Sequence, residues 1–478
     1  MSLKRIPTGI NGLDPIVDGG FPKGSLILLA GNPGTGKTIF SAQFLYHGVT
    51  EHGENGVYVS FAESRETFFS NMLDFGFEFE KLEEKGKFRF LDMVTMREEG
   101  VSSLLEMILS EVRSIKAGRL VIDSFSAMAQ AFKEKIEARI ILHTVLGKIV
   151  RQAGCTTLIV CEVPIGEEHI GVSIEEFVAD GVFILKKSEL EGRLAREIGI
   201  VKLRGTKLSQ LLYFFTLEKG FQVFLPFRPR TIERVKKFQP VPDSEHHFST
   251  GSKDLDRILD GGYPKGGIVF IEIGATVSVQ QYHLILVPTL INFIRKGRSC
   301  LAYPSLGLSV NQISYISKKL YGLTDEEFNS LVRIFMPVLP GTDLPEPYTI
   351  AIEGNLQADI AKMLKIEAEL YNRTKRQPFV ADVSLDTLEV VYGKPVIREI
   401  NQCIARTKGR GNLMILHARP GVDPYLRQKA ADISDIHLKI MREHGTLLFY
   451  GVKPRTGLYV VEMDMSKGYP LPKLIPIV

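Results

Sequence analysis

The sequence predicts an α/β protein with two tandem domains, each a mostly parallel, doubly wound sheet with antiparallel hairpins at one edge. Three observations lead to this prediction. Short apolar runs alternate with longer amphipathic segments, which is typical of parallel strands joined by helical crossovers. The stretch TGINGLDPIVDGGFPKG at Thr8–Gly24 returns as TGSKDLDRILDGGYPKG at Thr250–Gly266, 242 positions later. A glycine-rich loop follows the first stretch and opens a helix.

The bulk properties of the chain are those of an ordinary soluble protein with room for two such domains in 478 residues. A formal net charge of +4 argues against a general affinity for nucleic acid or anionic membranes. The four cysteines are scattered without a metal-binding spacing, which is typical of a reducing compartment. No signal-like first segment and no membrane-spanning apolar run is found, so we expect a cytoplasmic protein.

Residues 1–226 alternate strand-like and helix-like segments, as a doubly wound sheet requires. The predicted strands are apolar runs, at Leu26–Ala30, Val57–Phe61, Phe88–Asp92, Leu120–Ile122, Thr157–Cys161 and Val182–Lys186. The predicted helices lie between strands, at Lys37–Thr50, Arg65–Phe75, Val101–Ala117 and Glu137–Gln152. The following stretch, GIVKLRGTKLSQLLYFFTLEKGFQVF, turns at glycines and predicts antiparallel hairpins at the sheet edge.

Residues 227–247 interrupt this pattern with prolines and clustered charge, which predicts a solvated linker. The adjacent His246 and His247 have no further ligand at a useful spacing, so we predict no metal site there. Residues 248–478 then repeat the plan of the first half more loosely. The matching strands are predicted at Ile268–Ile273, Phe379–Asp382 and Leu413–His417, with terminal hairpins over Leu447–Met465.

GNPGTGKT, at Gly31–Thr38, matches the phosphate-binding pattern GxxxxGK[ST] in full. Its glycines let backbone N–H groups turn toward phosphates, and the helix N-terminus adds partial positive charge. Lys37 would reach the β- and γ-phosphates of ATP, and the Thr38 hydroxyl would ligate Mg²⁺. The predicted nucleotide-binding residues are consecutive in the chain: Gly31, Asn32, Pro33, Gly34, Thr35, Gly36, Lys37, Thr38 and Ile39.

Hydrolysis needs further groups, and strand ends supply candidates. Asp123 ends the run LVID, where it would join Thr38 in the Mg²⁺ shell, unless it only caps a turn. Glu63 ends VYVSFAE, where it would orient or deprotonate the attacking water, unless it only caps a helix. Lys202 and Arg204, in VKLRGT, would neutralise charge on the transferred phosphate, unless they are surface charges of an edge strand.

Together these motifs resemble the KaiC-like branch of the RecA superfamily of ATPases. The resemblance rests on the opening segment, GNPGTGKT, FAES, ETFFSNMLDFGF, IDSFSAM, EEFVADGVFIL and VKLRGT, and in weakened form it continues over residues 248–478. It implies tandem RecA-like P-loop domains, ATP and Mg²⁺ as ligands, and hexameric rings with nucleotide between subunits. It further implies that Glu63 is the catalytic acid and that Lys202 and Arg204 act on the neighbouring subunit's ATP. The chain departs from the family at Ala62, where a second glutamate is often found.

The second copy has lost the phosphate cradle. With Gly274 aligned to Gly31, its loop reads GATVSVQQ, and its strand end CLAYPSLG has no carboxylate. The second and third glycines, the lysine and the threonine are replaced by Val277, Val279, Gln280 and Gln281. Because β-branched residues disfavour the backbone angles of such a loop and no cation remains, we predict no working ATP site in this half.

Some parts of the second copy remain. Asp382 keeps a strand-end carboxylate, and Lys453 and Arg455 in VKPRT repeat the cations of VKLRGT. These cations either contribute to a subunit interface or do ordinary surface work, and both readings stay open. We predict that this half is a scaffold, ring-stabilising or partner-binding domain. A clock-type autokinase is not predicted, because the phosphorylated hydroxyl pair would fall on Ala431 and Asp432.

The leading functional hypothesis is therefore a regulatory Mg²⁺-ATPase that forms a homo-oligomeric ring and acts on an unknown protein partner. A DNA-dependent ATPase of recombinase type is one alternative. The stretch Cys161–Asp180, where RecA-like proteins hold DNA, has six acidic residues and no lysine or arginine, so it would repel phosphates. Only short basic runs, Arg228–Lys237 and Arg406–Gly411, favour nucleic acid. A switch that binds ATP with negligible hydrolysis is the other alternative.

Overall fold

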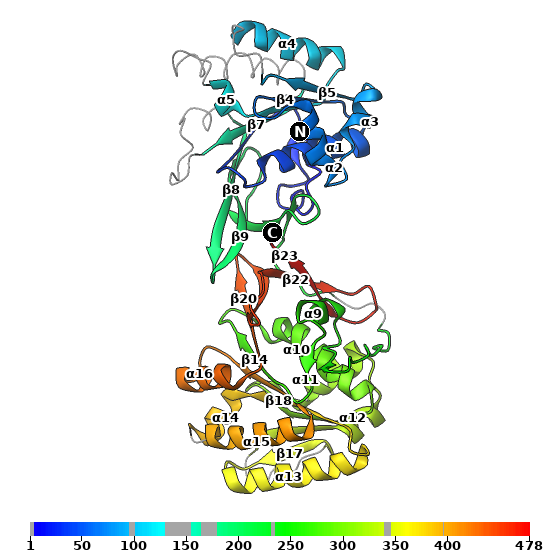
Figure 1. The fold of residues 1–478 in the computed structure, drawn as a ribbon, viewed down its shortest axis with the longest axis vertical. Helices are drawn as coiled ribbons and strands as arrows, with labels where there is room; N and C mark the ends of the chain where they lie inside the picture. Colours follow the sequence, from blue (N-terminus) through cyan, green and yellow to red (C-terminus); the bar gives the residue numbers. More distant parts are fainter. Residues whose placement is uncertain are drawn as a thin grey trace. The chain divides into compact units, whose positions relative to one another are not determined.

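The computed structural model describes residues 4–94, 101–129, 154–163, 179–230, 235–338, 346–394 and 396–478. The chain divides into two compact units, Met1–Leu225 with Pro476–Val478, and Pro226–Ile475. Figure 1 shows a central sheet with helices against its faces in each unit. The predicted fold class is confirmed: each unit is α/β, with a mostly parallel sheet extended by antiparallel strands at one edge.

The main sheet of the first unit, within the described residues, has the strand order β11-β10-β9-β8-β3-β7-β6-β4-β5. The strands from β8 to β5 run parallel, and β9 to β11 add antiparallel pairs at one edge. The bounds are β3 (Leu26–Gly31), β4 (Gly56–Ser60), β5 (Phe88–Asp92), β6 (Arg119–Asp123), β7 (Thr156–Glu162), β8 (Gly181–Leu190), β9 (Arg193–Leu203), β10 (Leu212–Thr216) and β11 (Gln222–Val223).

Helices cover both faces of this sheet and bury two hydrophobic clusters. One cluster includes α1 and a group of aromatic side chains from α2, α3, β4 and β5, and the other includes α4 and α5. The predicted helix Glu137–Gln152 lies outside the described residues. The short helix α3 was not predicted, because its six residues are too few to show a helical period. The bounds are α1 (Lys37–His52), α2 (Arg65–Leu73), α3 (Phe79–Glu84), α4 (Val101–Ser114) and α5 (Phe125–Ala129).

The repeated opening segment has the same architecture in both units. Each copy forms a two-stranded antiparallel pair, β1 (Arg5–Ile6) with β2 (Phe21–Pro22), and β12 (His247–Phe248) with β13 (Tyr263–Pro264). In the first copy the backbone N–H and the hydroxyl of Thr8 both donate to Asp14. In the second copy Thr250 donates to Asp256 in the same way. The opening segment therefore has the same stabilising threonine–aspartate contact in both units.

The main sheet of the second unit, within the described residues, has the order β17-β16-β15-β18-β19-β14-β20-β21-β22-β23. The strands from β17 to β20 are parallel, and β21 and β22 continue antiparallel. The bounds are β14 (Ile268–Ile273), β15 (Cys300–Tyr303), β16 (Val332–Pro337), β17 (Thr349–Ile352), β18 (Val380–Ser384), β19 (Leu413–Ala418), β20 (Ile436–Glu443), β21 (Thr446–Lys453), β22 (Tyr459–Asp464) and β23 (Leu471–Pro476).

The helices of the second unit again divide between two hydrophobic clusters. One cluster contains α10 with α12, and the other contains the side of the sheet that faces α13 to α16. The bounds are α9 (Lys253–Ile258), α10 (Val279–Arg295), α11 (Val310–Tyr315), the π-helical turn η2 (Ile316–Leu320), α12 (Asp325–Leu331), α13 (Leu356–Arg373), α14 (Leu385–Tyr392), α15 (Val396–Arg410) and α16 (Pro424–Ile433).

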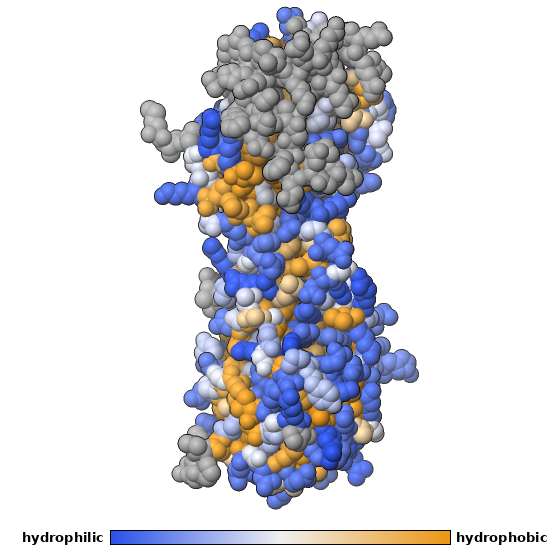
Figure 2. All heavy atoms as spheres, turned by 90° about the vertical axis from the view of Figure 1, so that its left-hand side faces the viewer, coloured by the Kyte–Doolittle hydropathy of each residue, from blue (hydrophilic) through white to orange (hydrophobic). Residues whose placement is uncertain are grey.

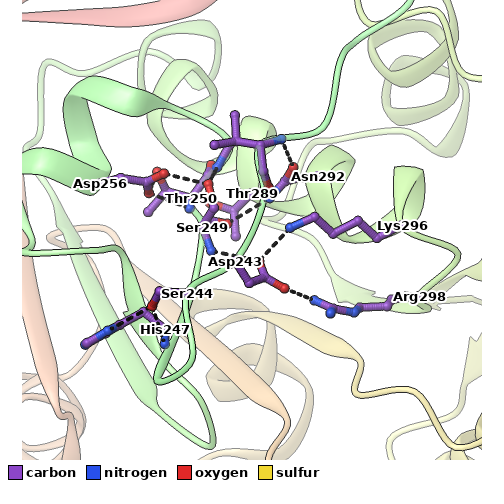
Figure 3. A network of polar contacts seen from close by, with 12 residues as sticks. Asp243, Ser244, His247, Ser249, Thr250, Asp256, Thr289, Asn292, Lys296 and Arg298 are labelled. Atoms are coloured by element: carbon purple, nitrogen blue, oxygen red, sulfur yellow. Dashed lines mark hydrogen bonds and ion pairs between the residues drawn. The ribbon is translucent and has the colours of Figure 1, made fainter.

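The predicted linker, residues 227–247, packs against the second unit where it is described. The Phe238 ring is buried, 4.8 Å from the ring of Tyr469, and its N–H donates to the Tyr321 carbonyl. The Asp243 carboxylate accepts from Lys296 at 2.5 Å and from Arg298 at 2.7 Å, as Figure 3 shows. The sequence predicted solvation because prolines and charges are dense, and most of the described segment is exposed, but Phe238 and Asp243 are fixed on the second unit.

The surface is mostly hydrophilic, with hydrophobic residues in separate patches on the face seen in Figure 2. Several exposed apolar side chains lie on or beside the antiparallel edge strands of the first unit: Leu194, Val201, Leu211 and Leu212. Among the helices of the described residues, none combines the length and apolar character that crossing a membrane requires.

Candidate functional site

The glycine-rich loop joins the end of β3 to the start of α1. Two of its glycines, Gly34 and Gly36, have φ values of 71° and 98°, which other residues rarely adopt. A Cβ at Gly31 would lie 2.6 Å from the Leu185 carbonyl oxygen, so that position also excludes a side chain. Gly36 is the N-cap of α1 and offers no side-chain hydrogen bond to the first turn. The first N–H groups of this 16-residue helix therefore face the loop without a capping side chain.

Lys37 lies folded over this loop. Its Nζ donates to the carbonyl of Gly31 at 2.9 Å and to that of Asn32 at 3.0 Å. Burial lowers the pKa of Lys37, while the nearby carboxylates of Glu162 and Asp123 act to raise it. A bound phosphate would neutralise the positive charge of Lys37, which the two carbonyl dipoles only partly offset. The lysine is thus held at the loop, in reach of any anion that the loop binds.

Asp123, at the end of β6, lies beneath the first turn of α1. Its Oδ2 accepts from the Thr38 hydroxyl at 2.9 Å and from the Tyr58 hydroxyl at 2.6 Å. Burial raises the pKa of Asp123, and the two hydroxyl donors only partly oppose this. The predicted neighbours Thr38 and Asp123 are therefore together in the structure. A hydroxyl and a carboxylate side by side are the oxygen ligands that Mg²⁺ takes in such sites.

Glu63 follows β4 in a tight turn. The Ser60 hydroxyl accepts from the Glu63 N–H at 3.0 Å and donates to its carbonyl at 2.7 Å. Its Oε2 is buried and has no hydrogen-bond partner among the described residues. Burial, followed by the negative charge of Asp123, raises the pKa of Glu63. Two carboxylates at one strand edge, with Asp123 raising the pKa of Glu63, form a site that a divalent cation would stabilise.

Lys202 and Arg204 lie at the far end of the sheet from the loop of their own unit. Lys202 pairs with Val182 on β8, and β8 pairs Gly181 with Ile27 near the start of β3. The Arg204 guanidinium binds Asp180, 3.1 Å away, at the level of Leu26. Because β3 rises about 3.3 Å per residue, roughly 16 Å of strand separates this level from Gly31. The structure does not bring these cations to the site of their own unit.

Two other cations, Arg196 and Lys187, lie at the glycine-rich loop of the first unit, and neither was predicted from the sequence. The Arg196 guanidinium donates to the Gly34 carbonyl at 3.3 Å, from the β8–β9 hairpin. Lys187 pairs with Arg196 across this hairpin, and its Nζ lies 2.8 Å from where a Cβ on Gly34 would be. The hairpin extends past the sheet edge and over the loop. Only its register, with Leu185 beside Gly31, would have revealed this from the sequence.

The second unit corrects the sequence alignment by one residue. Helix α10 begins at Val279, which is 242 positions after Lys37, the offset of the two opening segments. Val279 thus occupies the helix position of the lysine, and Gln280 that of the threonine, rather than Gln280 and Gln281. The alignment of Gly274 with Gly31 was wrong by one residue. Strand β3 ends at Gly31 and strand β14 ends at Ile273, so Ile273 is the residue equivalent to Gly31. The loop still lacks the cation and the hydroxyl.

Side chains also cap the start of α10. The side chain of Gln281 accepts from the Ser278 N–H at 2.8 Å, within a capping box. Lys453 donates to the Ser434 carbonyl at 2.8 Å, at the end of the sheet away from this loop. A capped helix start without a lysine has little to offer a phosphate.

The first unit therefore has a glycine-rich loop with the P-loop sequence between a strand and a helix of a doubly wound sheet, and its residues fit a Mg²⁺–nucleotide. The loop and the uncapped helix suit phosphates, and Thr38 and Asp123 supply oxygen ligands next to Glu63. This defines the class of protein as a P-loop nucleotide-binding protein of the α/β type.

Comparison with known proteins places the chain in a family. Residues 6–226 match the family model of the KaiC ATPase, and residues 237–326 match the model described as GvpD basic region 2. A UPF0273 protein of Pyrococcus horikoshii is 35% identical over 236 residues, which are 46% of this chain and 94% of that protein. The chain belongs to the KaiC family.

Two further relatives show the extent of the similarity. The circadian clock oscillator protein KaiC of Thermostichus vulcanus is 35% identical over 285 residues, covering 57% of this chain and 52% of that protein. The chain thus matches about half the length of this clock protein. The crystal structure of a KaiC-like protein from Pyrococcus horikoshii OT3 is 38% identical and covers 47% of this chain and 100% of that one, with a TM-score of 0.43.

Proposed function

We propose that the protein is a Mg²⁺-dependent ATPase of regulatory type, with its working site in the first unit. The observation that carries this proposal is the contact between Thr38 and Asp123, 2.9 Å apart beneath an intact phosphate-binding loop. The family membership supports the same conclusion, because residues 6–226 match a family of ATPases. The second unit, residues 226–475, has a structural or partner-binding role, since its loop is capped and lacks a lysine.

Each residue of the site has a proposed role. The loop N–H groups and Lys37 hold the β- and γ-phosphates, while Thr38 and Asp123 hold Mg²⁺, which when bound neutralises phosphate charge. Glu63 positions a water and accepts its proton as the water oxygen bonds to the γ-phosphorus. The bond from this phosphorus to the bridging oxygen then breaks, and ADP and phosphate leave. The raised pKa of Glu63 suits a group that takes up a proton.

We also propose that Lys202 and Arg204 complete the site of a neighbouring copy in a hexameric ring. Two features of this surface support the proposal. The cations lie at the end of the sheet where β3 begins, whereas the loop follows the other end of β3, so they cannot contact a nucleotide bound at their own loop. Exposed apolar side chains adjoin them, with Val201 55% and Leu211 60% exposed, and contact with another copy would cover these side chains.

The catalytic assignment is tested with Glu63→Gln. This change keeps the shape of the side chain and removes the proton acceptor, so ATP should still bind while turnover falls by at least about 100-fold. Steady-state phosphate release and nucleotide retention measure the two properties. Lys37→Ala is the control that should lose binding as well. Unchanged turnover in the Glu63 variant would remove Glu63 from the mechanism.

A switch with negligible hydrolysis is the second candidate, because Ala62 leaves Glu63 without a second acid beside it. Native mass spectrometry with Mg²⁺ and a slowly hydrolysed ATP analogue separates it from the first proposal, together with the turnover of the parent chain. A hexamer with one nucleotide per chain and measurable turnover supports the ATPase. A monomer that binds one nucleotide and does not turn over supports the switch.

A further inference from the structure

The second unit contains a recess beside α10 that is absent from the functions proposed so far. Its cavity volume is about 50 Å³, within a depression that is partly open to solvent. One side of α10, from Tyr282 to Ile294, forms a wall, and β15, α11 and α12 supply the others. The lining is mostly aliphatic, and five polar or titratable residues lie together at one end: Tyr282, His283, Ser305, Asp382 and His417.

The recess exists because three aromatic rings of the first unit have small counterparts in the second. In the first unit Tyr58, Phe68 and Phe90 pack together, with ring centroids 4.4 to 5.6 Å apart. Tyr58 pairs with Phe90 across β4 and β5, and Cys300 pairs with Val332 across β15 and β16.

The third ring is lost on the helix that follows the strand. Phe68 donates its backbone N–H to the carbonyl of the N-cap Ser64, and Ile313 does the same to the N-cap Ser309. Ile313 therefore stands where Phe68 stood. Cys300, Ile313 and Val332 all line the recess. The missing ring volume opens a space against the sheet at the same place in the repeated fold.

The loss of Tyr58 also changes the strand-end carboxylate. Asp123 pairs with Ser60, two residues after Tyr58, and Asp382 pairs with Ala302, two residues after Cys300. Asp382 therefore lacks the tyrosine hydroxyl that Asp123 receives. Instead its Oδ1 lies 3.2 Å from His417 Nε2, which becomes an ion pair only when the imidazole is protonated.

The polar end of the recess has unused hydrogen-bonding capacity. His417 is buried and His283 is partly buried, and the Nδ1 atoms of both are buried without a hydrogen-bond partner among the described residues. Burial, with the nearby His417 and Arg419, lowers the pKa of His283 to about 3, so this imidazole is neutral at ordinary pH. In the described residues no group of three or more acidic, histidine or cysteine side chains could hold a metal ion. Because a neutral imidazole keeps one ring nitrogen as an acceptor, the end of the recess can accept a hydrogen bond from a donor.

We propose that this recess binds a small, uncharged, mostly apolar molecule that carries a single hydroxyl or N–H donor. An unfilled apolar space and an unpartnered buried nitrogen each cost folding free energy. A ligand with an apolar body and one donor offsets both costs. Because the recess lies wholly within the second unit, this proposal does not depend on the ATPase activity of the first.

Phenol and toluene are the probes, since they share a ring and differ in one hydroxyl. Isothermal titration of the full chain should show saturable binding of one phenol per chain. Phenol should bind at least as tightly as toluene, although it is the better hydrated of the two in water. His283→Leu or His417→Leu should shift the ratio of the two affinities by about tenfold toward toluene, the effect of one lost hydrogen bond. No saturable binding, or an unchanged ratio in both leucine variants, overturns the proposal.

Filling the recess tests its location. Val332→Phe and Ile313→Phe restore rings that the first unit has, and each should reduce phenol binding by at least about tenfold. Val390→Phe, at a site that is 69% exposed on α14, is the matched control and should bind phenol like the parent. Unfolding temperatures identify variants that fold, and the two positions allow for the loss of one. A folded ring variant that binds phenol like the parent overturns the proposal.

Discussion

Asp123 has the contacts expected of a metal ligand, but burial makes its ionised form unfavourable in the absence of metal. It is buried, and its pKa is raised mainly because water is excluded from it. A carboxylate with a raised pKa favours the folded state below its ordinary titration range, and this contribution is lost as the pH rises through the folded-state value. At neutral pH the site without metal therefore holds an unfavourable charge. Binding of Mg²⁺ would remove that cost.

We predict that Asp123→Asn leaves the metal-free protein at least as stable as the parent at pH 7. Asparagine keeps an acceptor for Thr38 and Tyr58 and carries no charge. The difference between variant and parent should shrink toward pH 4, where the parent carboxyl becomes protonated. Thermal unfolding with and without Mg²⁺–ATP measures both effects, and the variant should lose the stabilisation by ligand. A large loss of stability at pH 7 in the variant would contradict this account.

Arg196 is the residue whose importance only the structure reveals. Its guanidinium contacts the Gly34 carbonyl, so it lies at the phosphate-binding loop of its own unit. We predict that Arg196→Gln weakens ATP binding by about tenfold, the effect of one charge-assisted hydrogen bond. Lys186→Gln is the control, because Lys186 lies on the neighbouring strand β8 and points to the other face. Equal affinity of both variants in a fluorescent-nucleotide titration would remove Arg196 from the site.

How far the sequence predicts the site depends on where the information lies. Lys37, Thr38 and Asp123 belong to local patterns, a glycine-rich loop and a strand end, and the sequence analysis expected them together. Arg196 contacts Gly34, which lies 162 positions away in the chain, because the register of its hairpin places it there. No local pattern contains that distance. The same limit applies to Tyr58, which reads as a core residue until its hydroxyl is seen on Asp123.

At the scale of elements, α1 and α10 show how one helix start loses its ligand. Both helices follow a buried strand at equivalent positions, but α1 begins after an uncapped Gly36 and α10 begins after Ser278 in a capping box. Free N–H groups at a helix start attract anions, while side-chain caps satisfy the same groups internally. The helix start of the second unit is therefore satisfied by its own side chains.

The segment that precedes the second unit is an element with its own stabilising contacts. The pKa of Asp243 is lowered: burial acts to raise it, but hydrogen bonds from Lys296, Ser249 and Arg298 outweigh burial. A depressed pKa means that the stabilisation is present above the ordinary carboxyl range and is lost as the pH falls through the folded-state value. The network in Figure 3 should therefore matter at neutral pH and not in acid.

We predict that Asp243→Asn lowers the free energy of unfolding of the second unit by about 1–3 kcal/mol at pH 7, because two partly buried cations lose their partner. The loss should be much smaller near pH 3. Calorimetric unfolding at the two pH values measures it. Asp432→Asn is the control, because its pair with Lys429 is exposed and contributes little. An equal effect of the two substitutions at pH 7 would mean that the Asp243 network is not a stabilising one.

At the scale of the whole molecule, the two units share a fold but differ in the residues at the start of the helix that follows the first long strand. The first retains the loop, the helix start and the carboxylates, and the second retains the sheet and the opening segment. Lys202 lies at the end of the sheet away from its own loop, which is the observation behind the proposal that it serves a neighbouring copy. That placement makes the proposed ring testable.

We predict that Arg204→Ala and Lys37→Ala chains complement each other when mixed. Each variant alone should lose at least about 90% of turnover, since each lacks one half of a shared site. In mixed rings a Lys37→Ala chain provides Arg204 to a neighbour with an intact loop, so part of the turnover should return. Phosphate release is measured after subunit exchange at several mixing ratios. Unmixed samples held under the same conditions are the control, and no recovery despite proven exchange would exclude a site shared through Arg204.

The sequence by itself determined the α/β class, the strands and helices around the phosphate-binding loop, and the loss of that loop from the second copy. These features depend on residues close together in the chain, through periodicity, glycine-rich turns and strand ends. The tertiary structure decided where Arg196 and Tyr58 lie, which end of the sheet holds Lys202, how the predicted linker packs, and that a recess stands where three rings are missing. These features depend on strand register and on contacts between distant segments, and such contacts leave no local pattern in a single sequence.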